Sequence, residues 1–326
     1  MADEGKPSTR EEQARRLAES MKRQLGQFCG FLAEPGLVEL MLNADGTVWA
    51  DRLGQGMAPV GTMPSASAES FIGTVASTLR STVTRENPIL ECELPLDAPF
   101  DGSRFEALIP PVVPAPVFTI RRKASAVFTL QEYERQGIMS SRQRAAIEAA
   151  VAQRHNILVV GGTGTGKTTL TNAVIDYMVQ AAPQHRIVII EDTSELQCAA
   201  KNAVVMRATD TVDMQRLLKA TMRLRPDRII VGEVRGGEAL SLLKAWNTGH
   251  PGGVCTVHAN HARAGLQRVE QLIAEVSQTP MRTLIAEAVN LIVSIVKTGN
   301  AAGRRIDEIV AVTGCTDGEY RFSTLE

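Results

Sequence analysis

One stretch of the sequence has the residue types and the spacing to bind a phosphate chain. Residues 161–168 read GGTGTGKT and fit the pattern G-x-x-x-x-G-K-[ST]. Glycines let the main chain bend around an anion with its N–H groups pointing inward, and a following helix adds the positive end of its dipole. Lys167 would reach the β- and γ-phosphates, and the Thr168 hydroxyl would ligate Mg²⁺. The residues predicted to bind the nucleotide here are Gly161, Gly162, Thr163, Gly164, Thr165, Gly166, Lys167, Thr168 and Thr169.

The segments on either side of this loop are the ones that a phosphate-binding loop needs. Residues 157–160 form a short apolar run that predicts a buried strand, and residues 169–182 carry apolar side chains at helical spacing. The alternative is a glycine-rich turn with an incidental lysine. Because glycine makes up only about 7% of average sequences, a chance match in a chain of this length is roughly a one-in-a-hundred event. The sequence therefore predicts a nucleotide site.

Carboxylates follow two later apolar strands. Glu191, Asp192 and Glu195 come after strand 187–190, where carboxylates can hold Mg²⁺ or orient an attacking water. The alternative is that Asp192 or a neighbouring serine caps a helix. Glu233 ends the strand that begins at residue 228, and it is the best candidate for orienting or deprotonating the hydrolytic water. The predicted metal ligands are Thr168, Glu191 and Asp192, and the predicted catalytic residues are Glu233, Glu191, Glu195, His258 and Lys167.

Histidines and arginines complete the set of candidate residues. His258 ends a predicted strand, where it could sense the γ-phosphate or donate to the transition state, whereas the role of His250 stays open. A hydrolysing site also needs positive charge at the γ-phosphate, often from a neighbouring subunit. The candidates for this charge are Arg223, Arg225 and Arg235, with surface salt bridges as the alternative.

Composition excludes several other classes of protein. The 326 residues carry a formal net charge of −1 and only 4% aromatic residues, which argues against a nucleic-acid-binding surface. Five widely spaced cysteines without a C-x-x-C pair indicate reduced thiols in a cytoplasmic protein. The N-terminus lacks the apolar core of a signal peptide, and no apolar run approaches the roughly 20 residues that span a bilayer. We expect a soluble protein that could dock on a membrane partner.

Length and patterning predict two domains. Residues 1–123 are expected to form a small α+β domain whose residues 1–9 are disordered, 124–139 a linker, and 140–326 the nucleotide domain. The expected elements of the first domain are helices at 10–28 and 67–83, a hairpin at 36–53, strands at 89–94, 104–109 and 117–123, and a proline-rich loop at 110–116. After residue 156 strands and helices alternate, which predicts a mostly parallel α/β sheet.

The order of four segments resembles a known family. GGTGTGKTT, IIEDTSEL, RLRPDRIIVGEVRGGEA and TGHPGGVCTVHAN are similar to the Walker A, Asp-box, atypical Walker B and His-box elements of type II and type IV secretion ATPases, over roughly residues 100–300. The resemblance implies an α/β fold with a C-terminal RecA-like P-loop core and a smaller N-terminal α+β domain of PAS-like type. It also implies Mg-dependent ATP hydrolysis in a hexameric ring, with Arg104 and Arg121, and Arg122 as a further candidate, leaning over the nucleotide.

The short form of the chain resembles the type IV branch and its conjugal transfer ATPases. It lacks the cysteine-rich insertion and the long N-terminal extension common in type II members. This branch implies a cytoplasmic motor at the inner membrane that contacts the membrane peripherally through partners of a mating-pair machine, binds no nucleic acid directly, and drives pilus biogenesis or substrate transfer. The alternatives are a type IV pilus assembly or retraction ATPase and a nucleotide-gated platform with little turnover.

Overall fold

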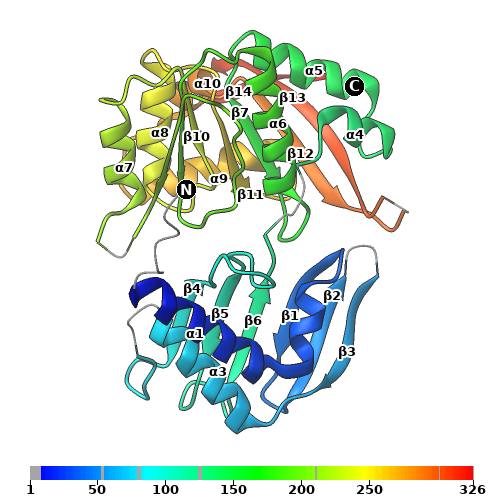
Figure 1. The fold of residues 1–326 in the computed structure, drawn as a ribbon. Coiled ribbons are helices and arrows are strands. Elements are labelled where there is room, and N and C mark those ends of the chain that lie inside the picture. The colour runs from blue at the N-terminus through cyan, green and yellow to red at the C-terminus, as the bar shows by residue number, and fades with distance from the viewer. Residues whose placement is uncertain are drawn as a thin grey trace, which may run out of the picture. The chain divides into compact units, whose positions relative to one another are not determined.

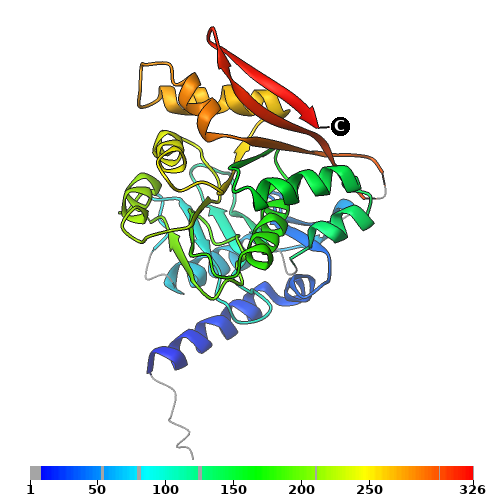
Figure 2. The same cartoon turned by 90° about the horizontal axis from the view of Figure 1, so that it is seen from above.

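The computed structural model describes residues 9–52, 55–78, 82–123, 127–209, 211–300 and 302–325 (Figures 1 and 2). The chain divides into two compact units, Met1–Ser125 and Ala126–Glu326. Residues 1–8, most of the segment predicted to be disordered, lie outside the described residues, and Thr9 already begins the first helix. None of the described helices is long and apolar enough to cross a membrane.

The first unit is a six-stranded antiparallel sheet with helices packed on one face, in the order β3-β2-β1-β6-β5-β4. Alternate strand residues such as Leu40 and Ile120 point into a core shared with α1 and α3, where the rings of Phe71, Phe105 and Phe118 meet. The elements are α1 (Thr9–Leu25), a 3₁₀ turn (Gly26–Phe28), α2 (Cys29–Leu32), β1 (Leu37–Leu42), β2 (Thr47–Arg52), β3 (Gly56–Thr62), α3 (Ser65–Thr78), β4 (Ile89–Glu93), β5 (Arg104–Leu108) and β6 (Val117–Arg121).

Two features of this unit differ from the prediction. Strand β3 was not expected, because Pro59 and two glycines weaken the strand signal; as an edge strand it tolerates a proline. Helix α3 ends at Thr78 instead of continuing to Val83, and residues 82 and 83 are already outside the helix. Threonine and valine have low helix propensity, so the sequence around residues 82–84 does not extend the helix.

The second unit is built on an eight-stranded sheet in the order β14-β13-β12-β7-β11-β10-β8-β9. The six strands from β12 to β9 run parallel, and β13 and β14 are antiparallel. The strands are β7 (Ile157–Gly161), β8 (Ile187–Glu191), β9 (Ala203–Arg207), β10 (Arg228–Val231), β11 (Val254–His258), β12 (Leu291–Lys297), β13 (Arg304–Thr316) and β14 (Glu319–Leu325). The helices are α4 (Leu130–Arg135), α5 (Ser141–Ala152), α6 (Lys167–Ala181), α7 (Met214–Thr221), α8 (Glu238–Asn247), α9 (Ala262–Ala274) and α10 (Arg282–Ala288).

Helices cover both faces of this sheet, as Figure 2 shows for α5 and α6 on one side and α8 and α9 on the other. Leu158 and Val160 of β7 pack into the cluster formed with α8, α9 and α10, whereas Ile157 and Val159 pack into the cluster formed with α4, α5 and α6. The mostly parallel α/β class is therefore confirmed.

Within the segment predicted as a linker, residues 127–139 contain α4. Thr129 caps this helix with a reciprocal Thr129–Glu132 capping box, and Leu130 and Tyr133 are buried in the core of the second unit. A six-residue helix is too short for the periodicity that reveals longer helices. The next helix begins after Ser140, whose side chain caps it.

The parallel sheet gathers the predicted site residues at one edge. The carboxyl ends of β7, β8, β10 and β11 lie together, so the loops that follow them meet there. The residues that precede these strands lie at the opposite edge. All five cysteines are free.

Candidate nucleotide site

The loop between β7 and α6 has a conformation that only glycine adopts without strain. Gly164 and Gly166 have φ angles of +68° and +98°, in the left-handed region. Gly161 lies so close to the neighbouring strand that an added Cβ would be 2.5 Å from the Ile295 carbonyl oxygen. The loop leads directly into the N-terminus of α6, whose dipole favours an anion at this point.

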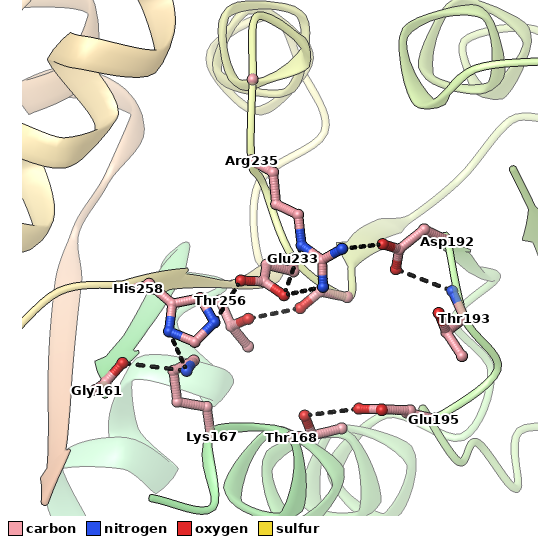
Figure 3. A network of polar contacts seen from close by, with 12 residues as sticks. Gly161, Lys167, Thr168, Asp192, Thr193, Glu195, Glu233, Arg235, Thr256 and His258 are labelled. Atoms are coloured by element: carbon pink, nitrogen blue, oxygen red, sulfur yellow. Dashed lines mark hydrogen bonds and ion pairs between the residues drawn. The ribbon is translucent and has the colours of Figure 1, made fainter. Parts of the chain in front are cut away.

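Lys167 is folded back on the loop and is only 8% exposed. Its ammonium donates to the carbonyl oxygens of Gly161 and Gly162, at 3.1 Å each, and its Nζ lies 3.1 Å from His258 Nδ1 (Figure 3). An ammonium has three N–H donors and no acceptor, so His258 Nδ1 must be the acceptor in this contact. The lysine is thus already positioned at the mouth of the loop.

His258 lies between Lys167 and Glu233, which follows β10. Its Nε2 lies 2.9 Å from Glu233 Oε1, and because Nδ1 accepts from Lys167, a neutral ring carries its proton on Nε2, beside the carboxylate. Burial lowers the pKa of His258, and the positive charge of Lys167 lowers it further, while Glu233 opposes the shift. We infer that the imidazole is neutral at pH 7.

Glu233 is held from its other side by Arg235. The guanidinium donates from Nε and Nη2 to Glu233 Oε2, at 3.0 and 2.8 Å, and its Nη1 lies 2.8 Å from Asp192 Oδ2. Only 15% of the Glu233 side chain is exposed. The result is a continuous polar chain, Lys167–His258–Glu233–Arg235–Asp192, across the ends of four strands (Figure 3).

The loop after β8 brings a second carboxylate to the loop–helix junction. Thr168 Oγ1 donates to Glu195 Oε2 at 3.1 Å. Glu191 is almost fully buried, and its Oε2 accepts the backbone N–H groups of Glu195 and Leu196 at 2.9 and 3.0 Å. Glu191 therefore fixes the loop that presents Glu195. No group of three or more His, Cys, Asp or Glu side chains suited to a metal occurs among the described residues.

Three other candidate residues lie at the far edge of the sheet. Arg223 and Arg225 are exposed and precede β10, and His250 precedes β11 with its Nδ1 3.0 Å from the Pro226 carbonyl oxygen. The four residues of β10 place this edge about 13 Å from the opposite one, at roughly 3.3 Å per residue. The structure therefore does not bring these residues to the phosphate loop of their own chain.

The arginines of the first unit form a separate pair. Arg104 and Arg121 lie directly opposite each other on β5 and β6, so their side chains leave the sheet on the same face. Arg122 instead donates to the Glu34 carbonyl oxygen at 2.8 Å, which gives it a structural role.

Sequence reasoning missed two cationic residues beside the loop. Lys297 ends β12 and Arg304 begins β13, and their head groups lie next to Gly164 and Gly166. No motif marks them, because they reach the loop only through the pairing of β12 with β7.

The family described as type II/IV secretion system protein matches residues 66–320, which is more than half of the chain. The chain belongs to this family. The resemblance in the four segments is thereby confirmed. A probable conjugal transfer protein TrbB of Sinorhizobium fredii (strain NBRC 101917 / NGR234) is 54% identical over 310 residues, covering 95% of this chain and 94% of the relative.

Other known proteins are less similar in sequence. A conjugal transfer protein TrbB of Rhizobium radiobacter is 52% identical, covering 94% of this chain and 93% of its own. The X-ray structure of the Legionella pneumophila ATPase DotB has a TM-score of 0.63 at 18% identity, covering 95% of this chain and 83% of that one. The pilus retraction motor PilT with bound ADP has a TM-score of 0.57 at 19% identity, covering 95% and 81%. These structures share the fold, an N-terminal domain followed by a RecA-like core, as predicted.

Proposed function

We propose that this protein is the motor ATPase of a conjugative type IV secretion system. It is a secretion ATPase by family, and the relatives that are more than half identical to it are named for conjugal transfer. The observation that carries the assignment of the site is the contact chain from Lys167 through His258 to Glu233, because it joins a phosphate-binding loop to a candidate base.

ATP binding uses groups that are already in place. The main-chain amides of residues 161–168 and the N-terminus of α6 hold the β- and γ-phosphates. Lys167 exchanges its contacts with two carbonyl oxygens and His258 for the phosphate oxygens, which are stronger acceptors because they are charged.

Oxygen ligands for Mg²⁺ are present beside this loop. The Thr168 hydroxyl and the Glu195 carboxylate lie 3.1 Å apart, and hard divalent cations prefer oxygen ligands. When bound, the ion would neutralise charge on the β- and γ-phosphates. We assign the metal to Thr168 and Glu195 instead of Glu191 and Asp192, since Glu191 accepts backbone N–H groups and Asp192 pairs with Arg235.

Hydrolysis requires a water aligned on the γ-phosphate. Glu233 is partly buried and faces Lys167 through a single histidine, so a water between Glu233 and the γ-phosphate would be within reach of its carboxylate. Arg235 fixes the carboxylate by two hydrogen bonds. Once Lys167 turns to the phosphates, the His258 ring is released on its Nδ1 side and reports the presence of the γ-phosphate.

The chain works as a cytoplasmic hexameric ring at the inner membrane, in this proposal. Arg223 and Arg225 are exposed at the far edge of the sheet, where they could reach the γ-phosphate of a neighbouring subunit but not that of their own chain. Arg104 and Arg121 would lean over the nucleotide, and hydrolysis would move the first unit relative to the second. Its partners are membrane proteins of the mating-pair machine, not nucleic acid.

A test combines assembly, turnover and conjugation. The purified protein is expected to hydrolyse ATP only with Mg²⁺. With ATP present, its molar mass from light scattering is expected to be that of a hexamer. A donor strain that carries Glu233→Gln in place of the wild-type protein is expected to lose plasmid transfer. A strictly monomeric, nucleotide-inert protein would refute the proposal, and normal transfer by the variant would show that conjugation does not depend on turnover.

A further inference from the structure

The phosphate loop has charged neighbours on two sides. In the sheet, β7 lies between β11 and β12 (Figure 1). Strand β11 ends in His258, which contacts Lys167, and β12 ends in Lys297. Because both strands run parallel to β7, their carboxyl ends flank the loop on opposite sides. The hydrolytic residues occupy only the β11 side.

Two cations meet on the other side. Lys297 and Arg304 are directly opposite each other at the end of the β12–β13 pair where the chain passes from one strand to the next, so their side chains leave the sheet on the same face. Like charges in this arrangement destabilise a sheet. Within the described part of the chain neither side chain makes a hydrogen bond or an ion pair. Arg305, the next residue, pairs with Asp307 at 2.6 Å. An anion bound from outside the chain would relieve the repulsion between Lys297 and Arg304.

Both head groups approach the glycines of the loop. An added Cβ on Gly164 would lie 3.0 Å from Lys297 Nζ, and one on Gly166 would collide with Arg304 Nη1. Arg304 also lies near Tyr133 of α4. Burial raises the pKa of Tyr133, and the nearby positive charge of Arg304 opposes that rise. The guanidinium therefore sits between α4 and the loop, next to amides that bind phosphate in loops of this type.

The orientation of the nucleotide follows from these contacts. Lys167 points toward His258 and Glu233, which places the γ-phosphate on the β11 side. A phosphate chain that runs along the loop then brings its other end to the β12 side. We propose that Lys297 and Arg304 bind the α-phosphate end of the nucleotide. This inference rests on the proposed function, because the ligand it needs is ATP or ADP.

Affinity measurements on single variants test the proposal. The variants are Lys297→Gln and Arg304→Gln, with Arg305→Gln as the matched control on the same strand pair. Each of the first two is expected to weaken binding about tenfold, the size of one charge-assisted hydrogen bond. The factor should be the same for ADP and ATP, because both carry the α-phosphate. The control should bind as the wild type does, and Arg304→Lys should recover most of the loss.

A thermal measurement separates this role from support of the loop. Without nucleotide, the two variants should melt at the wild-type temperature or above it, since a repulsion has been removed. The increase in melting temperature on adding ADP should be smaller. Wild-type nucleotide affinity in both variants would overturn this inference but not the proposed function. Weaker binding of ATP with unchanged binding of ADP would also overturn it, because the cations would then lie at the γ-phosphate. A wild-type protein that binds neither nucleotide would overturn the proposed function as well.

Discussion

Replacing Glu233 by glutamine removes the charge of the proposed base and keeps its shape. The glutamine carbonyl oxygen can still accept from Arg235, whereas its NH₂ group would face His258 Nε2 and could not replace the carboxylate oxygen there. What is lost is the negative charge that attracts the proton of the attacking water. General base catalysis contributes about 10²- to 10⁴-fold, or roughly 2.7 to 5.5 kcal/mol of barrier. We expect kcat to fall by about that factor.

Binding should respond in the opposite sense. The γ-phosphate would sit near the Glu233 carboxylate, and removal of one of two like charges favours their approach. The affinity for ATP should therefore be unchanged or tighter, while kcat falls. Phosphate release measures kcat, and a fluorescent nucleotide measures affinity. Glu287→Gln, an exposed acid on α10 that contacts Asn247, is the matched control. A kcat within threefold of the wild type would refute the assignment of Glu233.

Three further predictions concern His258, the metal and the buried Arg228. The pKa of His258 in the folded protein is lowered below its unfolded value of about 6.5. The unfolding free energy of the wild type relative to His258→Gln, measured in urea, should therefore be constant above pH 6.5 and decline as the pH falls from there through the lowered pKa. A difference that does not vary with pH would contradict this prediction. Glu195→Gln should raise the Mg²⁺ concentration for half-maximal turnover severalfold, whereas an unchanged Mg²⁺ dependence would remove Glu195 from the metal site. Burial, reinforced by the charge of Arg154, lowers the pKa of Arg228 to about 10. The Arg228 guanidinium donates to the carbonyl oxygens of Gly252 and Val151. Arg228→Leu should therefore lower the free energy of unfolding by about 3 kcal/mol in denaturant titrations, and a loss below about 1 kcal/mol would contradict this structural role.

Local patterns in the sequence were sufficient where the site is made of consecutive residues. The strand, glycine loop and helix at 157–181 obey rules that act over a few residues, so the spacing predicted them. The parallel sheet then explains why Glu233 and His258 meet, since both follow strands that end at the same edge.

Other parts of the site depend on contacts that no local pattern encodes. Glu191 and Glu195 are equivalent as carboxylates at a strand end, and only the folded loop shows that Glu191 accepts backbone N–H groups while Glu195 faces Thr168. Lys297 and Arg304 reach the loop through the pairing of distant strands. His250 shares a glycine-rich segment with His258, yet one strand length separates them.

The central claim is that Lys167 grips the phosphates of ATP at the mouth of the glycine loop and that this grip leads to hydrolysis. Lys167→Ala tests it most directly, with steady-state ATP turnover as the measurement. We predict that the purified variant stays folded and loses nearly all Mg-dependent ATP hydrolysis. Turnover at the wild-type rate would contradict it.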